Sequence, residues 1–412
     1  MFDAEAYLNS LEAIGWKLGL ERMELLSEEL GRPQDSYDTI HVVGTNGKSS
    51  VTRMCAALLE AHGNKAGCSL SPHLERWSER VMVSGTEIGA GPFASAVERT
   101  SLAAATVDAS LDEGDVTTQF EIATAAAFVA LADAGVEVAV VEAGLGGRLD
   151  ATNTINSKVT VLTSIGLDHT EWLGETELEI AKEKLAVLKP GSKLVHGPLT
   201  AQVEALAREH AEGLGCEVIA VKCDGRRDLE MASPGRFQQD NFEVAVAAAE
   251  ALIGVLDESA VREVARSVSI PGRLECIADN PPVYVDVAHN RPGAAALGAS
   301  IPEIAAGRPV VLVLATLEDK DASGMLAEMG GSIDTAILTE LPQDLLHNWG
   351  RPGARTFPAS DLESIIRELG VPSEVEPEPT NALSRAVCLA RERGGIVLIA
   401  GSHYLLSAVD IG

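Results

Sequence analysis

One short segment constrains this chain more than any other, the run from residue 39 to 51. Its first five residues are mostly apolar and predict a strand, a turn with two glycines follows, and residues 48–62 predict a helix. Glycines let backbone N–H groups turn towards an anion, and a helix N-terminus adds partial positive charge. Lys48 can reach terminal phosphates, while Ser49 or Ser50 can face magnesium. The segment therefore predicts a nucleoside triphosphate site.

The segment departs from the full G-x-x-x-x-G-K-[ST] pattern, because Val42 stands where the first glycine would be. A glycine turn without any ligand is the alternative interpretation. The order strand, turn, helix is the context that the motif requires, and it favours phosphate binding.

Charge and composition narrow the classes of partner. The chain of 412 residues carries a formal net charge of −29, and 46% of its residues are hydrophobic. Nucleic-acid binding requires clustered Lys and Arg, so we expect no nucleic-acid partner and interpret the acidity as solubility or a saline habitat. An anionic substrate must then meet local positive charge, for which Lys48, Arg148 and Arg273 are candidates.

The sequence predicts a cytoplasmic protein without a membrane partner. Its six cysteines are scattered and form no C-x-x-C pair, which is typical of reduced thiols rather than a disulfide framework or a zinc site. The N-terminus has no signal-peptide pattern, and no apolar run approaches the roughly 18 residues of a membrane span.

Strands alternate with helices along the chain, which predicts parallel α/β sheets. Pro271-Gly272-Arg273 reads as a hinge, after which the alternation restarts. The fold class predicted is α/β, with a P-loop ATPase-like domain over 1–270, whose sheet is mostly parallel, and a smaller C-terminal Rossmann-like domain over 271–412. Residues 75–90 are expected to be an irregular loop or small hairpin, and 371–380 a loop.

Polar groups stand at several predicted strand ends, where ligands of open α/β sheets bind. Glu142 is the last residue of a predicted strand over 136–142 and is a natural magnesium ligand. His169 follows the strand over 157–163, where Asp168 can orient its imidazole or cap a turn. Ser71 offers a hydroxyl to a metal, although Ser-Pro also starts turns.

Two further patterns allow more than one interpretation. Asp286 and His289 end a strand in the second domain, next to Asn290, which can simply cap the following helix. The glycines after Glu142 suggest a nicotinamide fingerprint, but Leu149 occupies the position of its third glycine, which disfavours that reading.

These motifs occur together, and in order, in one known family. The motifs are Gly44-Thr45-Asn46-Gly47-Lys48, Ser71-Pro72-His73-Leu74, Thr118-Gln119-Phe120-Glu121, the run from Glu142 to Asn153, Asp168-His169 with Leu173-Gly174, Glu183-Lys184, Pro271-Gly272-Arg273 and Asp286-Val287-Ala288-His289-Asn290. Over nearly its whole length the chain resembles bacterial folylpolyglutamate synthase/dihydrofolate synthase, of the Mur ligase superfamily.

The resemblance implies roles for particular residues. It implies ATP contacts at Thr45, Asn46, Gly47, Lys48, Asn241, Arg273 and Asp286. It implies magnesium ligands at Ser71, Glu142 and His169, and a carbamylated lysine (N6-carboxylysine) at Lys184. It implies a substrate site at Leu18, Gly19, Thr118, Gln119, Phe120, Glu121, Leu149, Asp150 and Ala151. Lys48, His169, Lys184 and His289 are then the candidate catalytic residues.

Three departures from the family pattern are visible. Ser49 follows the lysine where glycine is frequent, Leu185-Ala186 replaces Ala-Gly, and Phe237 stands where histidine is frequent. None of them removes a charged group that the chemistry needs.

The resemblance implies an ATP-dependent amide ligase, which adds L-glutamate to dihydropteroate, to folates, or to both, through an acyl phosphate. It also implies ATP, one or two Mg²⁺ ions, small-molecule substrates and a monomer. A monofunctional folylpolyglutamate synthase is the main alternative. A cell-wall Mur ligase would need a further domain before the loop, where this sequence has 43 residues. A GTP switch would carry an Asn-Lys-x-Asp motif for guanine, which this sequence lacks, and the intact Lys48 argues against a binding-only relative.

Overall fold

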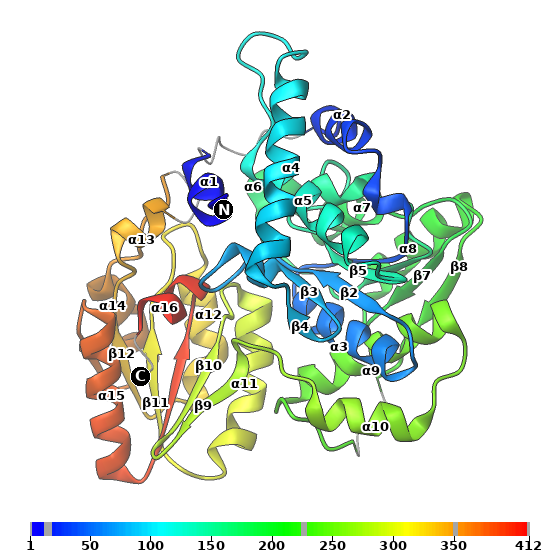
Figure 1. Ribbon diagram of the computed structural model, residues 1–412. Helices are drawn as coiled ribbons and strands as arrows, with labels where there is room; N and C mark the ends of the chain where they lie inside the picture. Colours follow the sequence, from blue (N-terminus) through cyan, green and yellow to red (C-terminus); the bar gives the residue numbers. More distant parts are fainter. Residues whose placement is uncertain (1, 12–18, 224–228, 349–352, 410–412) are drawn as a thin grey trace. The chain divides into compact units, whose positions relative to one another are not determined.

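The computed structural model describes residues 2–11, 19–223, 229–348 and 353–409 (Figure 1). The chain divides into two compact units, described separately below. Unit 1 comprises residues 1–231 and 239–268, and unit 2 comprises 232–238 and 269–412. The sequence predicts a single boundary after residue 270, whereas the short piece 232–238 also groups with unit 2. Phe237 in this piece packs against the hydrophobic core of unit 2.

The described part of unit 1 contains an eight-stranded sheet in the order β4-β3-β2-β5-β1-β6-β7-β8 (Figure 1). Strands β2, β5, β1, β6, β7 and β8 run parallel, and the β3–β4 hairpin adds antiparallel strands at one edge. The strands are β1 Asp38–Val43, β2 Ala66–Ser69, β3 Val81–Val83, β4 Thr86–Glu87, β5 Val138–Glu142, β6 Val159–Leu162, β7 Lys193–His196 and β8 Glu217–Ala220.

Strand β1 is central in this sheet, with β5 on one side and β6 on the other. The chain order reverses at β1, and in open α/β sheets such a reversal opens a crevice beyond the carboxyl ends of the strands. The loops after β1, β5 and β6 therefore converge at this point. Glu142 ends β5 at this point, and the loops after β1 and β6 lead to Lys48 and His169.

Helices cover both faces of the sheet of unit 1. They are α1 Ala4–Ser10, α2 Glu21–Glu29, α3 Lys48–Ala61, α4 Ala90–Asp108, α5 Gln119–Asp133, α6 Thr170–Leu173, α7 Glu177–Leu185, α8 Ala201–Gly213, α9 Arg236–Ile253 and α10 Glu258–Ser267, with 3-10 turns at η1 Pro33–Asp35, η2 Trp77–Arg80 and η3 Ala151–Thr154. One core packs α1, α2, α4 and α5 against β5, and another packs α7 and α8 against β6 and β7.

In its described part, unit 2 has a six-stranded sheet in the order β13-β12-β11-β14-β10-β9, parallel except for β9 (Figure 1). The strands are β9 Arg273–Asp279, β10 Pro282–Asp286, β11 Val310–Leu314, β12 Thr335–Leu338, β13 Ser373–Val375 and β14 Ile396–Ala400. The helices are α11 Arg291–Ala305, α12 Ala322–Met329, α13 Gln343–Asn348, α14 Ala359–Glu368, α15 Pro379–Arg393 and α16 His403–Ala408, with η4 at Gly330–Ser332.

Strand β11 shows why this sheet is covered on both faces. Its alternate residues point to opposite sides, so Leu312 and Leu314 join a core with α11, α12 and α14, while Val311 and Val313 join a core with α15 and α16. A strand buried on both faces reads as a continuous apolar run, which is what the sequence shows.

The predicted fold class is confirmed, with two differences in detail. The stretch 371–380 is not all loop, because β13 pairs with β12 in register. Residues 75–90 form the η2 turn and the β3–β4 hairpin, so the second of the two expected alternatives is present there.

Candidate functional site

The loop between β1 and α3 holds a shape that glycine alone permits. Gly44 and Gly47 have φ values of +154° and +83°, in the region that L side chains rarely adopt. A Cβ on Gly44 would lie 1.9 Å from Oγ1 of Thr163, and one on Gly47 would lie 2.5 Å from Oδ1 of Asn241. The segment after β6 and helix α9 thus approach the loop closely, and Asn241 lies beside the predicted phosphate cradle.

Hydrogen bonds hold this loop in place. Asn46 N donates to Ser164 Oγ at 3.0 Å, and Thr163 Oγ1 donates to Asn46 O at 2.6 Å. Thr45 Oγ1 donates to Gly166 O at 3.1 Å. These bonds join the phosphate loop to the segment that leads from β6 to His169.

The side chain of Lys48 folds back over the same loop. Its Nζ donates to Gly44 O at 3.1 Å and to Thr45 O at 3.3 Å. The ammonium is thereby stationed at the mouth of the cradle, beside the backbone N–H groups at the start of α3. This arrangement fits the terminal phosphates of a nucleoside triphosphate.

Glu142 gathers two of the predicted magnesium-binding groups. Its carboxylate is buried at the end of β5 and accepts hydrogen bonds from Ser49 Oγ at 2.9 Å and from Ser71 N at 3.1 Å. Of the two serines that follow Lys48, Ser49 therefore faces this carboxylate, whereas Ser50 is buried in the core.

A carboxylate flanked by two serines supplies oxygen donors, which suit Mg²⁺. Among the described residues no group of three His, Cys, Asp or Glu side chains is placed to bind a metal by itself. Such a sparse set fits Mg²⁺, which keeps several waters and shares its coordination with substrate phosphates.

The third predicted metal ligand, His169, directly precedes α6. Its φ of +49° is left-handed, and its backbone N donates to Asp168 Oδ1 at 3.0 Å. The ring Nε2 lies 3.8 Å from the same carboxylate oxygen. Asp168 thus fixes the backbone of His169 and lies near its ring, where a carboxylate can orient a metal-binding histidine.

The glycine-rich loop after Glu142 packs tightly on its surroundings. A Cβ on Gly144 would lie 2.3 Å from the Phe120 ring, and one on Gly147 would lie 2.7 Å from Glu183 O and 2.9 Å from Lys184 Cα. The loop therefore presses directly on the backbone of α7, which brings Lys184 towards the phosphate loop.

Lys184 is buried, with 4% of its surface exposed. Burial, and after it the nearby positive charge of Lys48, lower its pKa from 10.5 to about 7, although the charges of Asp168 and Asp150 oppose this shift. A helical lysine is usually solvated, so this environment is unusual. The neutral amine that it favours is the form that reacts with carbon dioxide.

Asp150 is buried behind the same loop and accepts hydrogen bonds from Leu145 N at 2.7 Å and Thr152 N at 3.0 Å. Thr152 Oγ1 also donates to this carboxylate, and His41 Nε2 lies 2.8 Å from Thr152 Oγ1. Because the single hydroxyl proton is given to Asp150, His41 must donate from Nε2. His41 on β1 thus fixes the hydroxyl that orients Asp150.

This network predicts an acid sensitivity for the fold. Burial, together with Lys189, lowers the His41 pKa from 6.5 to about 3, so between these values the unfolded chain binds more protons than the folded one. Stability should therefore fall as pH drops from 6.5 towards 3. Between pH 7 and pH 4.5, the free energy of unfolding of His41→Gln should fall by about 2 kcal/mol less than that of the wild type. Urea unfolding at pH 7 and 4.5 measures it; an equal loss in both proteins would contradict it.

The predicted substrate segment 118–121 is held by a buried ion pair. Arg22 contacts Glu121 twice, Nε to Oε2 at 3.1 Å and Nη2 to Oε1 at 3.0 Å. Glu121 Oε2 also accepts from Thr118 N at 2.7 Å, which closes a capping box at the start of α5. The Gln119 amide donates to Leu8 O at 2.8 Å. The side chains of Gln119 and Glu121 therefore fix the conformation of segment 118–121.

Other predicted substrate residues lie around the same loops. Ala151 begins η3 and is buried, and Leu149, two residues earlier, is exposed. A Cβ added to Gly19 would lie 3.8 Å from Arg22 Nη1. Leu18 lies outside the described residues.

In unit 2, Asp286 ends β10 as a buried carboxylate. It accepts hydrogen bonds from Leu274 N at 2.9 Å and Ala288 N at 2.7 Å, and burial raises its pKa against the opposing charge of Arg273. His289 follows, with Nδ1 placed 2.9 Å from Val287 O. The motif thus places Arg273, Asp286 and His289 at one end of β9 and β10.

The structure brings most of the unit 1 candidates together. Lys48, Glu142 and Lys184 surround the end of β1 and β5, and the bonds from Thr45 to Gly166 connect them to the His169 segment. Sequence reasoning did not predict the long-range contacts that His41 and Arg22 make in the structure. The apolar strand around His41 and the helical spacing around Arg22 gave no signal of either contact.

Comparisons with known proteins define the class. The Mur ligase middle domain matches residues 42–221, and the Mur ligase glutamate ligase domain matches residues 272–403. The dihydrofolate synthase/folylpolyglutamate synthase of Mycobacterium tuberculosis is 36% identical over 78% of this chain and 74% of its own. The chain is thus a Mur-type, ATP-dependent ligase.

Two solved structures are similar over almost the whole chain. Folylpolyglutamate synthase of Mycobacterium tuberculosis, complexed with ADP and AMPPCP, has a TM-score of 0.87 and 32% identity, with 95% and 94% of the two chains covered. A bifunctional folylpolyglutamate synthase/dihydrofolate synthase with Mn, AMPPNP and L-glutamate bound has a TM-score of 0.80 and 28% identity, with 98% and 95% covered. The chain belongs to the dihydrofolate synthase/folylpolyglutamate synthase family.

Proposed function

We propose that this protein adds L-glutamate both to dihydropteroate and to folates, in each case through an acyl phosphate. Its family activity is ATP-dependent glutamate ligation to folates, with a divalent metal. The double name of its relatives and the intact segment 118–121 support the two-substrate form. The observation that carries the proposal is the buried Glu142, which joins Ser49 and Ser71 beside the phosphate loop.

Amide synthesis requires activation of the acceptor carboxylate, which is by itself a poor electrophile. The acceptor carboxylate attacks the γ-phosphorus of ATP, ADP leaves, and the glutamate amine then displaces phosphate from the acyl carbon and loses a proton. Lys48 and the backbone N–H groups of the loop stabilise charge on the phosphates. Mg²⁺, when bound, neutralises charge on the phosphoryl oxygens. Ser71, Glu142 and His169 would hold it.

The remaining residues take their roles from the same scheme. Thr45, Asn46, Gly47 and Asn241 line the ATP cradle of unit 1. In unit 2, Arg273 and Asp286 are the candidate ATP-binding residues, and His289 is the candidate catalytic residue. Gly19, Phe120, Leu149, Asp150 and Ala151 form the acceptor site, together with Leu18.

We place the protein in the cytoplasm as a monomer, acting on small molecules and not on nucleic acid. All six cysteines are free thiols, as in a reducing compartment. Among the described residues, no helix has both the length and the apolar character needed to cross a bilayer. The net charge of −29 opposes nucleic-acid binding.

One assay tests the proposal. Purified protein with ATP and Mg²⁺ should release phosphate when both glutamate and an acceptor are present, with dihydropteroate or with a reduced folate as that acceptor. Activity with the folate alone would reduce the proposal to a monofunctional synthase. Phosphate release that ignores both glutamate and acceptor would overturn it.

A further inference from the structure

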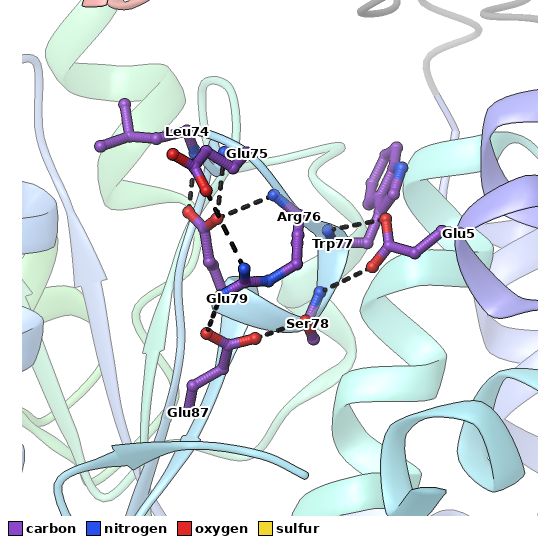
Figure 2. Close-up of polar contacts among 8 residues, drawn as sticks. All are labelled: Glu5, Leu74, Glu75, Arg76, Trp77, Ser78, Glu79 and Glu87. Carbon is purple, nitrogen blue, oxygen red and sulfur yellow. Dashed lines mark hydrogen bonds and ion pairs between the residues drawn. The ribbon is translucent and has the colours of Figure 1, made fainter. Parts of the chain in front are cut away.

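The N-terminal helix α1 presents two polar side chains, one turn apart, to a distant loop. Glu5 accepts hydrogen bonds from Trp77 N at 3.1 Å and from Ser78 N at 3.4 Å (Figure 2). Asn9 Oδ1 accepts from Trp77 Nε1 at 2.8 Å. The first N–H groups of a helical turn need an outside acceptor, and α1 supplies it to η2.

The loop that α1 holds is internally braced. The Glu79 carboxylate accepts from the backbone N atoms of Leu74, Glu75 and Arg76 at 2.8, 3.0 and 2.8 Å (Figure 2). The Arg80 guanidinium lies 4.1 Å from the centre of the Trp77 ring.

One end of this braced loop reaches the site. Ser71 donates its N–H to Glu142, and His73, two residues on, packs its ring 4.6 Å from the centre of the Trp77 ring. Trp77 and His73 are therefore packed together in the segment that leads to Ser71.

The other end of α1 is joined to the segment that begins α5. Gln119 Nε2 donates to Leu8 O at 2.8 Å and to Leu11 O at 3.4 Å, so it pairs two carbonyls at the helix C-terminus. A single short helix thus bridges the Ser71 loop and the 118–121 segment.

We propose that α1 is a positioning element of the ligase site, in which Glu5 and Asn9 set the Ser71 loop and Gln119 ties that setting to the acceptor segment. This inference rests on the proposed function, because it assigns the purpose of the Ser71 loop to metal binding. Glu5 and Asn9 are positioning residues, since they act through Trp77 and Ser78.

The test compares Glu5→Ala and Asn9→Leu with Asn9→Asp, which keeps an acceptor for Trp77 Nε1. We expect the first two to raise the Mg²⁺ concentration for half-maximal rate by about tenfold, as changes behind metal ligands do. The KM for glutamate should stay unchanged, and Asn9→Asp should behave as wild type. Amide exchange at Trp77 and Ser78 should accelerate in Glu5→Ala without any substrate.

A matched control separates positioning from stability. Asp257 is also a carboxylate that accepts a backbone N–H at a helix start, from Ala260 N at 3.0 Å, and it caps the N-terminus of α10. Asp257→Ala should lower thermal stability and leave the Mg²⁺ dependence unchanged. An unchanged Mg²⁺ dependence in Glu5→Ala, with wild-type ligation intact, would overturn the inference. Absence of ligation in the wild type would instead overturn the proposed function. The amide exchange measurement would then still test whether Glu5 holds the backbone of Trp77 and Ser78.

Discussion

Lys184→Ala should abolish ligation, with a loss of about 10³-fold or more, and Lys184→Glu should retain more activity than alanine. If the lysine amine takes up carbon dioxide, an N–C bond forms and a proton is lost, so a cation becomes a carboxylate. A carboxylate suits magnesium where an ammonium repels it. Glutamate restores the negative charge on a shorter side chain, which explains partial and not full activity.

The pKa of Lys184 gives this prediction its pH dependence. Because burial and Lys48 lower that pKa to about 7, the reactive neutral amine becomes the main form as pH rises above 7. At fixed dissolved carbon dioxide, the carbamate should therefore form faster at pH 8 than at pH 6. Enzyme that has lost its carbamate should regain activity correspondingly faster at pH 8. Isotopically labelled bicarbonate should give a carbamate signal that is absent from Lys184→Ala.

Lys182→Ala is the matched control, since it changes an exposed lysine on the same helix, α7. It should leave the ligation rate and the carbamate signal unchanged. Alanine and glutamate variants at position 184 that both react at nearly the wild-type rate would contradict the prediction. A labelled carbamate in Lys184→Ala would place the modification elsewhere.

The site's framework could be predicted because it depends on local patterns. A glycine turn between a strand and a helix specifies its own geometry, which is why Gly44 and Gly47 were informative. Strand ends such as Glu142 converge because parallel strands share one edge. The fold class followed from the alternation of strands and helices, and short elements such as β13 were missed because three residues carry too little pattern.

The rest depends on contacts that no local pattern encodes. Arg22 and Glu121 are 99 residues apart, and His41 and Thr152 are 111 apart, so their pairing appears only after folding. Lys184 read as a solvated helical lysine until the close approach of Gly147 showed α7 pressed against the glycine loop. For Lys184, the resemblance supplied what the residue pattern alone could not.

Lys48→Met should reduce kcat by about 10³-fold, because a cation at transferring phosphates stabilises charge that no other donor of the loop carries in full. The folded state should survive, since the Lys48 side chain makes hydrogen bonds to the loop carbonyls of Gly44 and Thr45 and packs no core. Thermal unfolding beside steady-state phosphate release measures both expectations. Lys158→Met is the control, because this exposed lysine directly precedes β6, at the end of the strand away from the loop.

The same substitution should also shift the pH profile of the residual activity. The positive charge of Lys48 helps to lower the pKa of Lys184, so its removal moves that pKa back towards 10.5. Less neutral amine is then present at pH 7, and the residual rate of Lys48→Met should rise further into the alkaline range than the wild-type rate does. A parallel profile in the two proteins would show that the lysines do not share one electrostatic environment. A shifted profile would link the phosphate loop to the charge state of α7.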